Sequence, residues 1–156
     1  KPKVDDNFVV VSPDIGSVAR ARKVAARMDA KMAIIDKRRP KANVMEVMNI
    51  IGDVKGKNCL MIDDMIDTAG TIVQGAKALK EAGAKEIYAC CSHGVLSGPA
   101  IELLAASPIT ELAMLDTINI PKEKMLPAFR MISTAQIFAA AIENVYLDRP
   151  MSKIYD

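Results

Sequence analysis

The stretch Asp63–Thr71 holds three carboxylates and then a turn of small residues, placed between an apolar run and a helical pattern. The N–H groups at the start of a helix attract phosphate. Carboxylates beside it can accept hydrogen bonds from sugar hydroxyls or hold Mg²⁺. A plain turn capped by Asp67 or Thr68 would not explain the adjacent, mutually repelling charges of Asp63 and Asp64. The stretch therefore predicts a binding site for a phosphorylated sugar.

Two other predicted loops follow strand-like runs. The small residues of Ser12–Ser17 let backbone N–H groups face an anion, and Asp14 is a candidate cation ligand. The loop Asp36–Lys41 carries four cations in five positions, stiffened by Pro40. Positioned Lys and Arg side chains stabilise the charge that develops in polyphosphate transfer. Two plainer interpretations stay open, an Asp-capped turn for the first loop and a solvated basic loop for the second.

The single histidine and the three cysteines favour structural roles. His93 lies in Ser92–Gly94, where a Ser–His nucleophilic pair is conceivable but no nucleophile elbow surrounds it. The cysteines lie in apolar runs, are odd in number and lack metal-site spacing, at Cys59, Cys90 and Cys91. We expect buried, reduced thiols in a cytoplasmic protein.

Composition describes one globular domain of 156 residues, 51% hydrophobic and 26% charged. A net charge of +2, 4% aromatic residues and no Trp give no argument for a nucleic-acid partner. The apolar runs are too short to span a membrane, and no signal peptide is recognisable. Residues 1–7 resemble a linker or a fragment edge, so we expect a piece of a longer chain or a processed product, with the domain at 8–156.

Strand and helix patterns alternate, which predicts an α/β fold with an open parallel sheet. Ligands in such folds bind beyond the carboxyl ends of the strands. Residues 37–43 are predicted to form a loop, 44–54 fit a helix or a strand, Gly83 ends a helix and Thr134 caps one. Strands are expected at 8–11, 32–35, 59–62, 87–91, 112–115 and 131–132, and helices at 18–28, 71–82, 99–106 and 134–147.

Four motifs carry a resemblance to a known family. Asp63–Thr71 resembles the phosphoribosyl-diphosphate motif of type I phosphoribosyltransferases and their relatives. Ser12–Ala21, Ile34–Pro40 and His93–Ala100 resemble the pyrophosphate loop, the catalytic flexible loop and a further stretch of the ribose-phosphate diphosphokinases. The resemblance runs from Phe8 to the C-terminus. It implies a single type I phosphoribosyltransferase-like domain with an open, mostly parallel sheet flanked by helices.

The resemblance also implies an acceptor site for ribose 5-phosphate. Asp63 and Asp64 would bind the ribose hydroxyls, directly or through Mg²⁺ and water. The 5-phosphate would be held by Asp67, Thr68, Ala69, Gly70 and Thr71.

Catalytic and metal-binding roles are implied for three further residues. Lys37 and Arg39 would stabilise the diphosphoryl group in transfer from ATP to the C1 hydroxyl, with Arg39 also near the sugar phosphate. Asp14 would contact Mg²⁺. The products would be 5-phosphoribosyl 1-diphosphate and AMP, and positioning with charge neutralisation would supply most of the catalysis.

The family's enzymes have two similar domains, and the resemblance implies that this chain is the C-terminal one. The missing N-terminal domain would supply much of the ATP site, so the isolated chain is expected to be inactive or weakly active. A homo-oligomer, a hexamer by resemblance, is expected. The chain departs from the family at Gly16-Ser17, where two glycines are usual, and in Met151–Asp156, which only partly matches a regulatory segment.

Two alternative functions stay open. A nucleobase phosphoribosyltransferase would share the acidic motif, but we recognise no hood segment for a base. A non-catalytic regulatory homologue of the synthetase is the other alternative. The presence of Lys37, Arg39 and the complete acidic motif argues against that second alternative.

Overall fold

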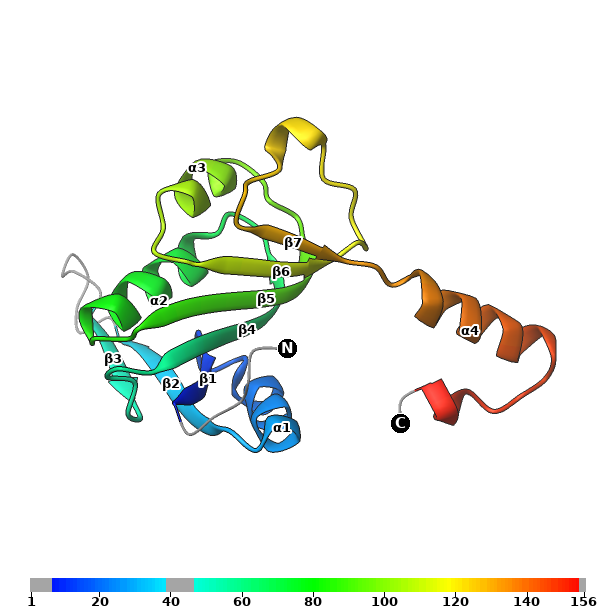
Figure 1. Ribbon diagram of the computed structural model, residues 1–156, viewed down its shortest axis with the longest axis horizontal. Coiled ribbons are helices and arrows are strands. Elements are labelled where there is room, and N and C mark those ends of the chain that lie inside the picture. Colours follow the sequence, from blue (N-terminus) through cyan, green and yellow to red (C-terminus); the bar gives the residue numbers. More distant parts are fainter. Residues whose placement is uncertain (1–6, 39–46, 155–156) are drawn as a thin grey trace.

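The computed structural model describes residues 7–38 and 47–154, which build a seven-stranded sheet between helices (Figure 1). The strand order is β3-β2-β1-β4-β5-β6-β7, and every neighbouring pair is parallel except β2 and β3. The predicted open, mostly parallel sheet is confirmed. The strands are β1 Phe8–Ser12, β2 Lys31–Arg38, β3 Val47–Ile51, β4 Asn58–Ile66, β5 Glu86–Gly94, β6 Glu111–Leu115 and β7 Phe129–Ile132.

Two hydrophobic cores lie on opposite faces of the sheet. In β1, Phe8 and Val10 pack with Ala21 and other residues of α1 (Val18–Met28). Val9 and Val11 point the other way and pack in the core of α2 (Gly70–Glu81) and α3 (Ala100–Ala105). Alternate residues of a strand face opposite sides, so the wholly apolar run of β1 is buried on both.

Helix α2 follows the sequence pattern closely. Its predicted stripe is buried, with Ile72 at 3%, Ala76 at 0% and Leu79 at 0% exposure. The helix ends where predicted, because Gly83 has a φ of +87°, a conformation that L side chains rarely adopt. Burial of this stripe fixes α2 over the sheet and so fixes where its N-terminus lies.

Helix α4 (Ala135–Tyr146) continues from β7 and extends away from the sheet (Figure 1). None of its residues is buried, and it packs against the short 3-10 helix η2 (Met151–Ile154). A second 3-10 helix, η1, spans Lys122–Lys124. The helix predicted for 134–147 is confirmed, but Thr134 makes no side-chain cap. Its hydroxyl donates to Asp116 Oδ1 over 2.6 Å instead.

Two predicted loops were wrong in part, because pairing with a neighbouring strand extends β2 and β5 beyond their predicted ends. Strand β2 runs through Lys37 and Arg38 against β3, so the predicted loop does not begin at Lys37, and residues 39–43 lie outside the described residues. The ambiguous stretch 44–54 contains strand β3, and 44–46 lie outside that description too. Strand β5 includes Ser92–Gly94, which we had predicted as a loop.

Within residues 7–38 and 47–154, we find no helix with the length and apolarity needed to cross a lipid bilayer.

Candidate functional site

A cavity of about 170 Å³ lies where the predicted acidic motif meets the loop after β1. The end of β4, the turn that follows it and the first turn of α2 form most of its wall. The structure thereby brings Asp14 together with the predicted phosphate-binding turn and with Asp63, which lies 49 residues later in the sequence. The lining residues are Asp14, Asp63, Met65, Ile66, Asp67, Thr68, Ala69, Gly70, Thr71 and Ile72.

The first turn of α2 faces this cavity without a side-chain cap. Ala69 occupies the N-cap position in the left-handed conformation, with a φ of 63°, and the residue is 5% exposed and belongs to the core. No side chain hydrogen-bonds the cap. The N–H groups of the first helical turn have no partner within the helix, so they can bind an anion that enters the cavity.

The turn before α2 is held in place by the segment after β5. Ser97 N–H donates to the backbone carbonyl of Asp67 over 3.0 Å, and the Ser97 hydroxyl donates to Asp67 Oδ1. Leu96 N–H donates to Ile66 O over 3.1 Å. Ser97 was missed from sequence, although it lies in one of the family-like stretches. Its position after the predicted strand next to the acidic motif could have indicated it, because the carboxyl ends of neighbouring parallel strands meet at one edge of the sheet.

A single arginine explains how two adjacent carboxylates are tolerated. Arg20 of α1 places Nη1 at 3.1 Å from Asp63 Oδ1 and Nη2 at 2.8 Å from Asp64 Oδ2. The Ser17 hydroxyl donates to Asp63 Oδ1 over 3.0 Å. Arg20 was not predicted as part of the site. Its position three residues after Ser17, on one helical face, was the signal that could have found it.

The two carboxyl groups have pKa values shifted in opposite directions. Burial raises the pKa of Asp63, whose side chain is 18% exposed, although hydrogen bonds from Asp64 N–H and Ser17 partly oppose the rise. The hydrogen bond from Met65 N–H, with a further contribution from Arg20, lowers the pKa of Asp64. Asp64 is thus the firmly ionised member, and Asp63 is the one whose charge most needs a cation or a donor beside it.

The loop after β1 is ordered by its own side chains. Asp14 Oδ1 accepts a hydrogen bond from Ser17 N–H over 2.8 Å, and the Ser12 hydroxyl donates to Asp14 O over 2.6 Å. Ser17 departs from the family pattern, yet its side chain is 4% exposed and its hydroxyl binds Asp63. The extra Cβ is therefore accommodated, and the residue joins this loop to β4.

The carboxylates suit a magnesium ion whose coordination is completed by water and a substrate. Among the described residues, no group of three or more His, Cys, Asp or Glu side chains could hold a metal ion. Asp14 and Asp63 nevertheless line one cavity. Mg²⁺ commonly binds one or two carboxylates and takes its other ligands from water and substrate phosphates. These donors suit an ion of that kind.

The described structure does not test the roles predicted for the two catalytic cations. Lys37 lies in β2, opposite Met48 of β3. Arg39 lies outside the described residues. Their roles stay predictions from the resemblance.

The histidine and cysteines make structural contacts. Thr117 donates its hydroxyl to Ser92 O over 2.9 Å, so it accepts a hydrogen bond from His93 Nδ1, 2.8 Å away. All three cysteines are free, and the predicted burial is confirmed for Cys59 and Cys91. Burial raises their thiol pKa values to about 11 and about 12.

The mostly parallel sheet, with the uncapped N-terminus of α2 and paired carboxylates at its carboxyl edge, is the fold predicted above, a type I phosphoribosyltransferase-like domain. Residues 36–156 match the family model described as phosphoribosyl synthetase-associated domain. The chain belongs to that family, so the predicted family resemblance is confirmed.

Several relatives are similar over nearly the whole chain. The ribose-phosphate pyrophosphokinase of Clostridium perfringens is 61% identical over 150 residues, covering 96% of this chain and 47% of the relative. That of Caldanaerobacter subterraneus subsp. tengcongensis is 58% identical over 153 residues, covering 98% and 48%. The crystal structure of phosphoribosylpyrophosphate synthetase from Mycobacterium smegmatis superimposes with a TM-score of 0.85 at 39% identity, covering 92% of this chain and 46% of that one. The chain spans about half the length of these relatives.

Proposed function

We propose that this chain supplies the ribose 5-phosphate half of a ribose-phosphate diphosphokinase. The observation that supports this most is the cavity in which an uncapped helix N-terminus lies beside the Asp63 carboxylate. A helix N-terminus binds phosphate, and a carboxylate accepts hydrogen bonds from hydroxyl groups. A phosphorylated sugar carries both groups on one small molecule.

The 5-phosphate occupies the cavity at the start of α2, where the N–H groups and hydroxyls of 67–71 donate to its oxygens. Asp63 and Asp64 accept hydrogen bonds from the ribose hydroxyls, directly or through Mg²⁺ and water. Asp14 holds Mg²⁺, which neutralises phosphate charge when it is bound. Arg20 keeps both carboxylates in place before the sugar arrives.

In the reaction, the C1 hydroxyl oxygen of ribose 5-phosphate attacks the β-phosphorus of ATP and loses its proton. The bond from that phosphorus to the oxygen bridging to the α-phosphorus breaks, so AMP leaves and 5-phosphoribosyl 1-diphosphate forms. Lys37 and Arg39 stabilise the charge on the transferring group. This transfer is carried by positioning and charge neutralisation rather than by a covalent intermediate.

The whole protein is proposed to hold a second half, which supplies most of the ATP site. The resemblance assigns the present chain to the C-terminal half and implies a homo-oligomer, a hexamer. The free cysteines support a reducing compartment, the cytoplasm. Reading the coding sequence on both sides tests the order of the halves. An upstream segment of about equal length supports the assignment, and a downstream one overturns it.

The binding claim is tested by calorimetry on the 156-residue chain with ribose 5-phosphate, ribose, ATP and a free nucleobase. Ribose 5-phosphate is expected to bind, and ribose at least tenfold more weakly. Thr71→Val removes one donor to a charged phosphate, which is worth roughly 1.5–3 kcal/mol, so affinity should fall about 10- to 150-fold. Thr110→Val is the matched control, because Thr110 hydrogen-bonds Glu86 away from the cavity.

The outcomes separate the candidate functions. Equal affinity for ribose and ribose 5-phosphate would refute the phosphate site. Binding of a nucleobase in the presence of phosphoribosyl diphosphate would favour a nucleobase phosphoribosyltransferase. Turnover of ATP and ribose 5-phosphate by this chain alone would refute the division of the site between two halves.

The catalytic claim is tested in the complete protein. Lys37→Ala should lower kcat by about two orders of magnitude or more while barely changing the KM for ribose 5-phosphate, because the lysine acts on the transferring group. An unchanged kcat would refute its role. A complete protein that binds ribose 5-phosphate yet has no turnover would instead favour a regulatory homologue.

A further inference from the structure

Asp67 lies where an aspartate ordinarily caps a helix. It comes two residues before Ala69, the N-cap residue of α2, and aspartate side chains commonly accept a hydrogen bond from the backbone N–H two residues further on. Such a bond would place the carboxylate over the first N–H groups of α2, where the proposed function places the 5-phosphate. In the described structure, Asp67 makes no such bond and α2 has no side-chain cap. The Asp67 carboxylate must therefore be held elsewhere.

A single residue, Ser97, binds Asp67 at two points. The Ser97 hydroxyl donates to Asp67 Oδ1, and Ser97 N–H donates to the backbone carbonyl of Asp67 over 3.0 Å. Asp67 lines the cavity, whereas Ser97 is not among the described residues that line it. The two hydrogen bonds therefore draw the carboxylate and the carbonyl oxygen of Asp67 towards the edge of the cavity.

The backbone hydrogen bond of Ser97 also fixes the direction of the next N–H group. In a planar trans peptide, an N–H points away from the C=O of the preceding residue. Because the Asp67 carbonyl points to Ser97, Thr68 N–H points the opposite way, and Thr68 lines the cavity. No group in the described part of the chain accepts a hydrogen bond from Thr68 N–H. Ser97 thus turns the oxygens of Asp67 outward and leaves a donor facing the cavity.

The position of Ser97 is set by the segment that follows β5. Val95 N–H and Leu96 N–H both donate to Ile66 O, over 3.0 and 3.1 Å. Leu96 has a φ of 51°, which is uncommon for a residue with a side chain, yet it is 4% exposed and belongs to the core. Such a conformation persists only where the surrounding structure fixes it. Ser97 is therefore presented to Asp67 by a rigid support.

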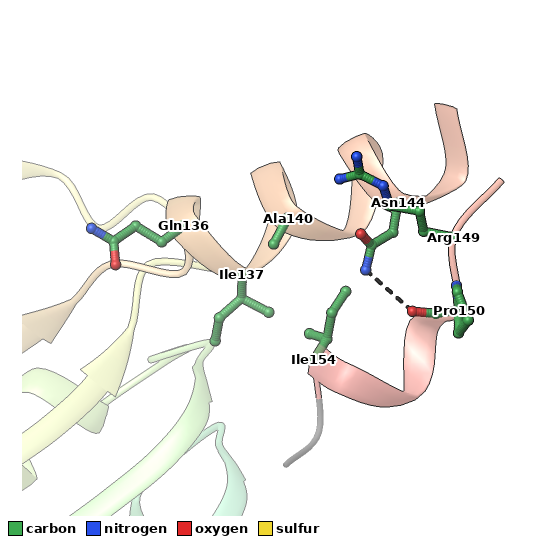
Figure 2. Close-up of a pocket in the computed structure, with 7 residues that line it drawn as sticks. All are labelled: Gln136, Ile137, Ala140, Asn144, Arg149, Pro150 and Ile154. Carbon is green, nitrogen blue, oxygen red and sulfur yellow. Dashed lines mark hydrogen bonds between the residues drawn. The ribbon is translucent and has the colours of Figure 1, made fainter. Parts of the chain in front are cut away.

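Helix α4 shows the opposite arrangement. At its start, Asp116 Oδ1 accepts a hydrogen bond from Thr134 N–H over 2.7 Å, and the Ser133 hydroxyl accepts one from Ala135 N–H over 3.3 Å. The hollow beside α4 lies along the side of the helix and is lined in part by Ile154 of η2 (Figure 2). Side-chain oxygens thus already occupy N–H groups at the start of α4, so these groups are not available to an anion.

We infer that Ser97 is a positioning residue for the 5-phosphate, because it keeps Asp67 from capping α2 and so leaves the first N–H groups of that helix to the ligand. The inference rests on the proposed function in taking a phosphate to bind there. A carboxylate released by Ser97 would compete with the phosphate for the same N–H groups and would repel its charge. Since Ser97 acts through Asp67, it should set the affinity for ribose 5-phosphate and not the rate of transfer.

A double-mutant cycle on the complete protein tests this role, with the affinity for ribose 5-phosphate measured by calorimetry. Ser97→Ala removes the hydroxyl but keeps the backbone N–H that binds the Asp67 carbonyl. Affinity should fall about fivefold or more, the cost of displacing one side-chain cap. In an Asp67→Ala background, the same substitution should change affinity less than about twofold, because no carboxylate is left to compete. Equal losses in both backgrounds, or no loss in either, would overturn the inference.

Further variants separate this role from a structural one. Ser97→Thr keeps a hydroxyl at an exposed position and should keep the parent affinity. Ser107→Ala removes a hydroxyl that donates to Leu104 O at the far end of α3, and it should leave the affinity unchanged. In kinetic assays, Ser97→Ala should raise the KM for ribose 5-phosphate about fivefold with little change in kcat, and a loss confined to kcat would overturn the inference. A parent protein that does not bind ribose 5-phosphate would refute the proposed function on which the inference rests.

Discussion

Replacing Gly52 by alanine should be far more damaging than the same change at Gly56. Gly52 directly follows β3, the antiparallel edge strand, and has a φ of +124°. A Cβ there would lie 2.8 Å from Ala33 Cβ, 3.0 Å from Ala33 Cα and 3.1 Å from Met32 O. Because two of these atoms belong to the backbone of β2, the clash cannot be relieved by rotating a side chain.

The cost has two parts. A non-glycine residue in such a conformation costs roughly 1–3 kcal/mol, and overpacking costs roughly 1–3 kcal/mol more, so the free energy of unfolding should fall by about 4 kcal/mol. Gly56 has a φ of +71° and no heavy atom within 4 Å of its would-be Cβ. Only backbone strain remains at Gly56, and the loss should be about 1 kcal/mol.

Urea denaturation followed by circular dichroism measures the difference. With a slope of roughly 2 kcal/mol per molar urea, the two midpoints should differ by about 1.5 M. The register of β2 and β3, which includes Lys37 opposite Met48, should be disturbed in Gly52→Ala alone. Equal midpoints for the two variants would refute the steric argument.

Three further predictions concern charge and reactivity. Hydrogen bonds from Thr134 and Ser133 lower the pKa of Asp116 to about 2, so its contribution to folding stability is complete above about pH 4 and is lost as the pH falls towards 2. Asp116→Asn should therefore weaken the dependence of the free energy of unfolding on pH in this range. An unchanged pH dependence in the variant would contradict this prediction. Arg20→Met should raise the pKa of Asp64, measured by carboxyl NMR titration, because Arg20 helps to lower it; a constant value would show that Met65 N–H alone sets the shift. Burial raises the pKa of the Cys91 thiol to about 12, so it should react with a disulfide reagent at pH 8 only in urea; rapid native reaction would contradict its burial.

The sequence predicted the centres of the elements better than their ends. The helices over 18–28 and 71–82 follow apolar periodicity, which survives in the structure because one face of each is buried. The ends of β4 and β5 carry Asp64, Ser92 and His93, polar residues that no strand propensity favours. They are extended because each strand pairs with the other, as in Met65 with His93, and such pairing is a tertiary effect.

From the sequence, only those neighbouring site residues could be predicted whose proximity follows from the strand order alone. Asp14 follows β1, and Asp63 lies near the carboxyl end of the adjacent parallel strand β4, so their meeting could be expected from the fold. Sequence position could place Arg20 and Ser97 near the site but could not give their contacts, since these depend on the direction of α1 and on the left-handed conformation of Leu96, with a φ of 51°.

The acidic pair belongs to a central strand and not to a loop. Strand β4 stays hydrogen-bonded to β5 through Ile66, beyond both carboxylates. The position of Asp63 therefore cannot change without breaking a ladder that lies inside a seven-stranded sheet. A ligand of these carboxylates meets a rigid receptor, and its binding should spend little free energy on ordering the backbone beneath it. The binding free energy at this edge is then limited by desolvation and by the freedom that the ligand itself loses. Any change of shape on binding has to come from the ligand or from the elements that face β4.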